Sequence, residues 1–232
     1  MKLFKKKEVP TPFSIEVTQE SLLDKSLLHT EKLDFQKYPA QDVYYYLFEN
    51  VFYNQEIITK IQANYVEYVP QSDKYFLDIG CGRGEFLNLL PQSGIKAKGI
   101  EINILEADLL TKKGFDVVNQ DAVSYLEQTE EIFSGISAIQ VVEHLEFDYL
   151  YKFIHLAYRQ IMQGGVIILE TLNPLLTKNL KYFYTDLTHK RPIPPDSLVF
   201  LCESAGFKDV KIRYSLPEGD EYVNYAVIGY KK

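Results

Sequence analysis

Three glycines at alternate positions, preceded by an acid and an apolar run, mark the stretch that most constrains this chain, Phe76-Leu77-Asp78-Ile79-Gly80-Cys81-Gly82-Arg83-Gly84-Glu85-Phe86-Leu87. Apolar residues at helical spacing follow the last glycine, so the stretch predicts a strand, a tight turn and a helix. Glycine allows the backbone to come close to a ligand, and free N–H groups at the start of a helix favour a negatively charged group. We therefore expect a nucleotide-binding corner here.

The glycine spacing favours one kind of nucleotide over another. A dinucleotide fingerprint would place its third glycine where this chain has Glu85. Asp78, just ahead of the first glycine, suits a cationic or amine-bearing ligand better than a pyrophosphate. Residues 96–100 predict a second strand that ends at Glu101, where a carboxylate can accept both hydroxyl groups of a ribose.

These motifs resemble those of the class I S-adenosylmethionine-dependent methyltransferases, over roughly residues 72–232. The resemblance implies S-adenosylmethionine as cofactor and S-adenosylhomocysteine as product. It implies cofactor contacts at the glycine turn and at the ends of the following strands, namely Asp78, Gly80, Cys81, Gly82, Gly84, Glu101, Ile102, Asp121, Ala122 and Val141. Asp121 would accept the adenine amino group, but it also fits the N-cap of the next helix. Cys81 also fits a purely structural role between two glycines.

Strands and helices are predicted to alternate along most of the chain. Predicted strands span 75–79, 96–101, 115–119, 136–142, 165–172, 207–214 and 222–230, and predicted helices span 84–91, 103–112, 122–129, 146–162 and 195–205. This order predicts a Rossmann-like α/β fold with a seven-stranded, mostly parallel sheet, an antiparallel last strand and helices on both faces. Helical periodicity between Asp42 and Val69 predicts helices that could cover the cofactor cleft. We expect an N-terminal extension and helical lid at 1–70 and a methyltransferase domain at 71–232.

Composition excludes some partners and leaves others open. A net charge of −7 and a pI near 5.2 argue against a nucleic-acid partner, and no stretch approaches the roughly 20 apolar residues of a membrane span. The basic start, Met1 to Glu8, predicts a solvated tail or a weak contact with an anionic membrane surface. We expect a cytoplasmic bacterial protein, at the inner membrane face if that contact forms. The sequence shows no convincing cluster of hard ligands and predicts no metal; it makes no prediction of oligomeric state.

Polar residues follow the predicted fourth and fifth strands, where an acceptor would meet the methyl group. Glu143-His144-Leu145 resembles a frequent methyltransferase motif, although His144 alone would more often be structural. The long segment after residue 172 contains Asp186, Thr188, His189, Arg191, Pro192 and Pro194. These are the fixed positions of the Asp-x-Thr-His-x-Arg-Pro-x-Pro segment in methyltransferases of bacterial surface-polysaccharide assembly, including O-antigen chain-terminating enzymes. Residues 45–53 also resemble a helix of that group, which commonly reads Phe-Glu-x-x-Phe-Arg-Gly. This chain has Tyr53-Asn54 in place of Arg-Gly.

The resemblance implies O-methylation of a sugar or sugar phosphate in a bacterial surface glycan. A sugar hydroxyl needs a general base, for which we predict His189, oriented by Asp186, and then His144. Predicted acceptor contacts are Arg191, Lys190, Glu143, Tyr184 and Tyr53, and the two cations would hold a phosphate acceptor. The acceptor would be a glycan, a nucleotide sugar or a small molecule. The alternatives are a methyltransferase for a quinone or natural-product phenol, and a non-catalytic scaffold that binds the cofactor.

Overall fold

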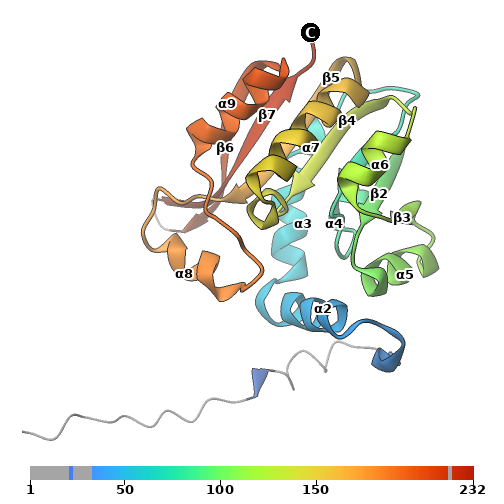
Figure 1. Ribbon diagram of the computed structural model, residues 1–232, viewed down its shortest axis with the longest axis vertical. Coiled ribbons are helices and arrows are strands. Elements are labelled where there is room, and N and C mark those ends of the chain that lie inside the picture. The colour runs from blue at the N-terminus through green and yellow to red at the C-terminus, as the bar shows by residue number, and fades with distance from the viewer. Residues whose placement is uncertain (1–20, 23–32, 219–220) are drawn as a thin grey trace, which may run out of the picture.

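The computed structural model describes residues 21–22, 33–218 and 221–232 (Figure 1). The basic start of the chain, for which we predicted a tail or a membrane contact, lies outside these ranges. Within them, no helix has both the length and the apolar character needed to cross a membrane.

Seven strands form one sheet in the order β3-β2-β1-β4-β5-β7-β6. Their bounds are β1 Phe76–Ile79, β2 Ala97–Glu101, β3 Val117–Asn119, β4 Phe133–Ile139, β5 Ile161–Leu172, β6 Lys208–Glu218 and β7 Glu221–Tyr230. β7 runs antiparallel to both β5 and β6, and the remaining neighbours pair in parallel. The predicted fold is thus confirmed. The strand order reverses between β1 and β4, so a ligand crevice is expected at the carboxyl ends of these strands.

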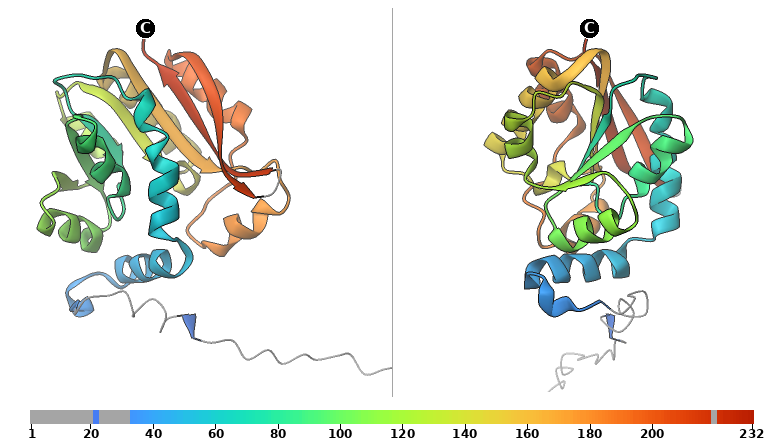
Figure 2. Two further views of the ribbon diagram at one scale, coloured as in Figure 1. Left: turned by 180° about the vertical axis from the view of Figure 1, so that it is seen from behind. Right: turned by 90° about the vertical axis from the view of Figure 1, so that its right-hand side faces the viewer.

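Helices cover both faces of the sheet (Figures 1 and 2). Their bounds are α2 Ala40–Phe52, α3 Gln55–Ala63, α4 Glu85–Gln92, α5 Ile104–Lys112, α6 Ala122–Gln128, α7 Phe147–Gln160, α8 Asn179–Thr185 and α9 Pro195–Ala205, with 3-10 turns η1 Phe35–Lys37, η2 Val66–Tyr68 and η3 Val142–His144. α6, α7 and α9 lie on one face, and α3 and α4 lie on the other. Apolar faces hold these helices on the sheet. In α7, for example, Leu150, Phe153 and Ile154 recur at helical spacing and are fully buried in the core.

The N-terminal extension is tied to the sheet by buried side chains. Ile61, Tyr65 and Val69 belong to the same apolar cluster as Phe76 and Val166 of the sheet. Tyr65 is fully buried, and its hydroxyl group donates to the carboxylate of Glu170 at the end of β5. α3 and η2 are therefore part of the core, while the domain boundary at residue 70 stays a prediction.

Several strands differ in their bounds from the sequence prediction: β4 begins at Phe133 instead of 136, β5 begins at Ile161 instead of 165, and β6 ends at Glu218 instead of 214. Two further differences bear on the site. β4 ends at Ile139 instead of 142, because Gln140 has a φ of 57° and turns the chain into η3. This turn is held by the Gln140 side chain, whose Nε2 donates to Glu170 Oε1 at 3.0 Å. α8 lies in a segment predicted to be irregular. Asn179 holds its first turn by donating to the backbone oxygens of Asn173 and Val223, which apolar periodicity does not reveal.

The glycine turn after β1 is possible only because its glycines have no side chains. Gly80 has a φ of 62°, and a Cβ atom at this position would lie 2.5 Å from Val141 Cγ2. Gly84 has a φ of 83° and lies equally close to the side chain of Leu110 on α5. The turn thus brings the start of α4 against the ends of β1 and β4, which a side chain would prevent.

This geometry predicts different effects of alanine at two left-handed glycines. Gly114 has a φ of 89° and no heavy atom within 4 Å of a built Cβ, so Gly114→Ala should lower the free energy of unfolding by about 1 kcal/mol. Gly80→Ala adds the clash with Val141 and should lower it by about 2 to 4 kcal/mol. Urea unfolding measures both, and equal losses would contradict the packing described here.

Candidate active site

α2 lies across the end of the sheet at which the parallel strands finish (Figure 1). Asp42 at its first turn holds the start of α5: the Ile104 N–H donates to Asp42 Oδ2 at 2.9 Å, and Asn103 Nδ2 donates to Asp42 O at 3.0 Å. Farther along α2, the ring of Tyr45 packs edge-on against His144, with 6.0 Å between ring centroids. α2 therefore covers this end of the sheet, while its role as a lid stays a prediction. Tyr45 was not among the predicted site residues.

Glu101 lies where a ribose-binding acid was predicted. Its carboxylate accepts hydrogen bonds from the N–H groups of Gly82 and Asn103, both at 2.8 Å. A carboxylate has about four acceptor positions, so acceptor capacity is left for ribose hydroxyl groups. The side chain is 5% exposed, and burial raises its pKa to about 7. These residues fit a nucleoside at the end of β2, where Ile102 exposes 71% of its surface.

Asp121 adopts the helix-capping geometry that the sequence left open. Its Oδ1 accepts from the Ser124 N–H at 2.8 Å at the start of α6, and its Oδ2 accepts from the Tyr149 hydroxyl at 2.5 Å. Ala122 is the first residue of α6. The N-cap role is therefore present, and the adenine role stays a prediction. Tyr149 was not foreseen, because nothing local in the sequence links it to Asp121.

Asp78 and Cys81 face the protein interior. Asp78 is 3% exposed and accepts a hydrogen bond from Ser137 Oγ on β4 at 2.6 Å. Burial raises the pKa of this carboxyl group to about 7. The Cys81 side chain is buried among Leu87 and Leu110, in agreement with its structural role. A cofactor contact through either side chain therefore lacks support in this geometry.

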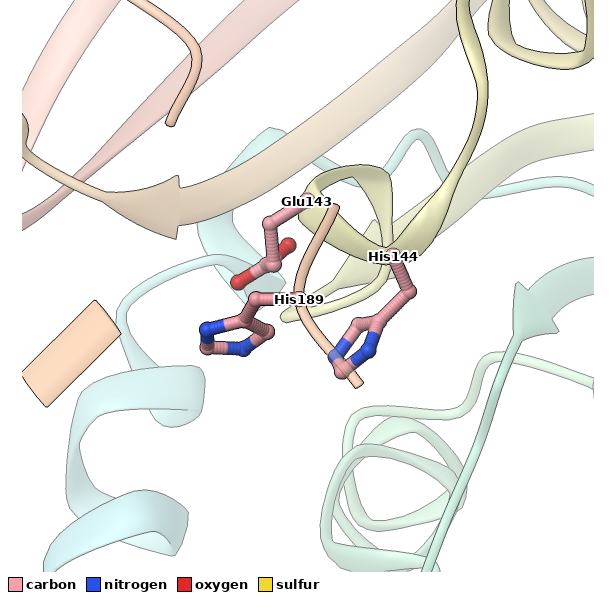
Figure 3. Close-up of side chains that lie close together, drawn as sticks. All are labelled: Glu143, His144 and His189. Atoms are coloured by element: carbon pink, nitrogen blue, oxygen red, sulfur yellow. The ribbon is translucent and has the colours of Figure 1, made fainter. Parts of the chain in front are cut away.

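The crevice contains a cluster that joins residues from two segments (Figure 3). Glu143 and His144 come from η3, and His189 comes from the loop between α8 and α9. The two imidazole rings lie 4.6 Å apart between centroids. One ligand-type atom of each of the three residues lies within 4.8 Å of the others. The structure thus brings together two predicted catalytic residues and one predicted acceptor contact.

Hydrogen bonds hold the two imidazoles in different ways. His189 Nδ1 lies 2.7 Å from the carbonyl oxygen of Phe183, so this nitrogen carries the proton. His144 Nδ1 lies 2.9 Å from Thr188 Oγ1, which donates to Asp186 Oδ1 at 2.7 Å. Asp186 therefore orients His144 through Thr188, while its Oδ2 lies 3.7 Å from His189 Nε2. The orienting partner of His189 is the Phe183 carbonyl group and not the predicted aspartate.

Burial keeps the groups of the cluster neutral near pH 7. It lowers the pKa of His144 to about 4, with a further contribution from His189, and it lowers the pKa of His189. Glu143 is 0% exposed, and burial raises its pKa to about 8. Neither oxygen of its carboxylate has a hydrogen-bond partner among the described residues. A buried carboxyl group without partners is unusual and points to a missing ligand.

The other predicted acceptor contacts are more dispersed. Arg191 Nη2 donates to the Leu145 carbonyl at 3.3 Å, and the guanidinium group lies over the ring of Phe147. Lys190 Nζ is exposed, 3.8 Å from Glu146. Tyr184 is 67% exposed. Both cationic side chains thus have partners outside the cluster, and their role as acceptor contacts stays a prediction.

Tyr53, the remaining predicted acceptor contact, lies near Glu49, an acid of α2 that the sequence analysis did not select. Tyr53 lines a cavity of about 690 Å³ between α2 and α5, together with Gly82 and Arg83. Glu49 on α2 is half-buried beside the buried Glu106, and burial raises the pKa of both carboxyl groups. Their convergence depends on the docking of α2 on α5. In the sequence, the helical periodicity of α2 was the only indication of this convergence.

Comparison with known proteins identifies the fold and the family. A family model described as a methyltransferase domain matches residues 52–212, which is well over half of the chain. The chain belongs to this methyltransferase family. The match begins at the end of α2 and includes the glycine turn, Glu101 and the Glu143, His144 and His189 cluster.

Individual relatives of this methyltransferase agree. A solved S-adenosylmethionine-dependent methyltransferase from Archaeoglobus fulgidus is 32% identical, has a TM-score of 0.74, and the match covers 81% of this chain and 100% of that one. A curated ubiquinone biosynthesis O-methyltransferase from Hydrogenovibrio crunogenus is 25% identical, over 75% of this chain and 83% of its own length. Magnesium protoporphyrin IX methyltransferase from Synechocystis, solved with bound S-adenosylhomocysteine, shares the fold at 16% identity and a TM-score of 0.55, over 77% of this chain and 83% of that one. The predicted enzyme class, a methyltransferase that uses S-adenosylmethionine, is confirmed.

The place of Glu101 predicts its importance for cofactor binding. Glu101→Ala should weaken binding of S-adenosylhomocysteine at least about tenfold, because two charge-assisted hydrogen bonds to the ribose are lost. Glu127→Ala, which removes an exposed carboxylate paired with Lys152 on the surface, is the matched control. Calorimetric titration measures both affinities. An unchanged affinity in Glu101→Ala would refute the ribose assignment.

The raised pKa of Asp78 predicts a pH dependence of stability. The folded protein keeps the proton up to about pH 7, whereas the unfolded chain loses it near 3.8, so unfolding releases a proton in between. Stability conferred by the protonated group is therefore lost as the pH rises through this window. Compared with Asp78→Asn, the free energy of unfolding of the wild type should fall by about 1 kcal/mol per pH unit from pH 5 to 7. Urea unfolding at three pH values measures this difference, and a constant difference would contradict it.

Proposed function

We propose that this methyltransferase transfers the methyl group of S-adenosylmethionine to a hydroxyl group of a sugar, as a cytoplasmic step in the assembly of a bacterial surface glycan. The observation that carries the proposal is the polar cluster of Glu143, His144 and His189 at the carboxyl end of β4. Groups of this kind can align and activate a hydroxyl group that is too weak a nucleophile by itself.

The reaction needs few groups from the protein. The acceptor oxygen forms a bond to the methyl carbon, the bond from this carbon to sulfur breaks, and sulfur keeps the electron pair, which gives S-adenosylhomocysteine. The hydroxyl proton passes to the Nε2 lone pair of His189, the predicted base, or to that of His144. Most of the rate enhancement would come from the alignment of the two reactants under α2.

The charge distribution favours a hydroxyl over a phosphate acceptor. Glu143 and Asp186 are both buried at the cluster, and Glu49 lies at the other end of the lid. The Arg191 and Lys190 side chains lie outside it, on Leu145 and beside Glu146. A phosphate would therefore lie among buried acids with no cationic side chain beside it, and an unpaired charge in a buried site is strongly unfavourable. A sugar hydroxyl carries no such penalty.

Methylation of a small phenol or quinol is the second candidate. It is favoured by the names of curated relatives, which are ubiquinone biosynthesis O-methyltransferases at 25% and 27% identity. It is also favoured by the aromatic rings that α2 and α8 bring to the crevice, among them Tyr45, Phe48 and Phe183. Such rings pack equally well on the apolar face of a sugar or on a phenol.

A single acceptor panel separates these functions. The protein is incubated with S-adenosylmethionine and with nucleotide sugars, short glycans, sugar phosphates, catechols and phenols, and products are followed by mass spectrometry. Transfer to hydroxyl groups of the sugars is expected. Transfer to phenols alone would establish the second candidate. Binding of the cofactor without any transfer would favour a non-catalytic scaffold.

The cluster predicts a separation between cofactor binding and turnover. His189→Ala should lower kcat at least about a hundredfold while the affinity for S-adenosylhomocysteine stays near that of the wild type. His155→Ala is the matched control, because His155 is half-buried on α7, away from the cluster, and contacts the carbonyl group and ring of Tyr151 on the same helix. Equal turnover of His189→Ala and the wild type would remove the cluster from the reaction.

A further inference from the structure

The cluster at the end of β4 has the composition of a metal site. Figure 3 shows Glu143, His144 and His189 converging from two segments of the chain. Three potential ligand atoms, one from each residue, lie within 4.8 Å of one another. Glu143 is buried and both histidines are half-buried, which separates this group from the acid clusters common on protein surfaces.

The two acids at the cluster have no lysine or arginine partner. Both oxygens of Glu143 and the Oδ2 atom of Asp186 are buried without a hydrogen-bond partner among the described residues. No lysine or arginine in the described part of the chain forms an ion pair with either acid. A buried acid without a partner is normally either protonated or bound to a metal, because an isolated buried charge is strongly unfavourable. A bound ion would supply the partner that these oxygens lack.

The hydrogen bonds of the imidazoles leave lone pairs available. A carbonyl oxygen can only accept, so His189 donates from Nδ1 to Phe183, and its Nε2 keeps a lone pair. Thr188 donates its single proton to Asp186, so it accepts from His144 Nδ1, and His144 Nε2 also keeps a lone pair. Such partners on the far nitrogen are usual for histidines that bind metals.

We propose that Glu143, His144 and His189 bind one divalent transition-metal ion, with Asp186 beside it. The ion takes the place of the base predicted for His189, and the chain then needs a metal that the sequence did not predict. Its role in catalysis rests on the proposed function: the ion would hold the acceptor oxygen and lower the pKa of its hydroxyl group, and the proton would pass to water instead of to the imidazoles. The bond to carbon forms and the bond to sulfur breaks as described above. Binding of the ion does not depend on that role.

The ligand set indicates the kind of ion. Two imidazole nitrogens and one carboxylate suit Zn²⁺, Co²⁺, Fe²⁺ or Mn²⁺ better than Ca²⁺, which prefers oxygen. Three protein ligands leave positions open for an acceptor, as in catalytic zinc sites. Ligands about 2.1 Å from one ion lie about 3 to 4 Å apart, so the three groups need to approach by about 1 Å on binding.

Cobalt provides a direct test that does not need an acceptor. Metal-stripped full-length protein is titrated with Co²⁺, and the visible absorption of the bound ion is recorded. One equivalent should bind saturably, and Glu143→Gln should weaken binding at least about tenfold. His155→Ala, which removes a histidine of α7 that lies outside the cluster, should bind like the wild type. No saturable binding, or equal binding by Glu143→Gln and the wild type, would overturn the proposal.

Two further measurements keep the result unambiguous. Thermal unfolding without metal checks that each variant folds, and His144→Ala replaces Glu143→Gln if the latter does not. Calorimetry with S-adenosylhomocysteine and the acceptor panel are run on the same preparations. Cofactor binding and sugar methylation without cobalt binding would overturn the metal site alone. Cobalt binding at this site without methyl transfer to sugars would support the metal site and overturn the proposed function.

Discussion

A backbone hydrogen bond between two segments that are distant in sequence holds the candidate site together. The Lys190 N–H donates to the carbonyl oxygen of Glu143 at 2.8 Å, which draws the loop after α8 onto η3. The adjacent His189 is thereby placed beside His144. A second tie comes from Thr188, which joins Asp186 to His144. A third comes from the Tyr225 hydroxyl on β7, which donates to Ile193 O at 2.7 Å. The loop is therefore fixed from several sides, although it has little regular structure.

Burial at the carboxyl end of the sheet determines the chemistry that is available there. α2 covers this end, and Asp78, Glu101 and Glu143 all have raised pKa values because water is excluded. The three acids differ in their partners. Asp78 is satisfied by Ser137, and Glu101 is satisfied in part by backbone N–H groups. Glu143 has no hydrogen-bond partner among the residues that the structure describes. The acid that most needs a ligand therefore lies at η3 and not at the glycine turn.

The sequence predicted the sheet, and the places of Gly80 and Glu101 in it, because these depend on local patterns. Gly80 and Glu101 stand at strand ends that follow directly from apolar periodicity. The end of β4 was predicted wrongly, since the turn depends on a contact between Gln140 and Glu170 of the next strand. α8 was missed for the same reason, because Asn179 takes its partners from β7 and the preceding loop.

The candidate site could be predicted residue by residue but not as a cluster. Glu143, His144 and His189 were each marked by their motifs. Their convergence depends on the path of the loop, and the edge-on contact of Tyr45 with His144 depends on where α2 docks. The roles of the partners also changed, because Asp186 acts on His144 through Thr188. Such long-range geometry leaves almost no local trace in a single sequence.

A crystal structure of the complex with S-adenosylhomocysteine would test the central claim most directly. The account predicts that the ribose hydroxyl groups contact Glu101 and that the sulfur atom faces Glu143, His144 and His189 across a space for one acceptor oxygen. A sulfur atom that faces away from this cluster, with other groups around the methyl position, would contradict the account.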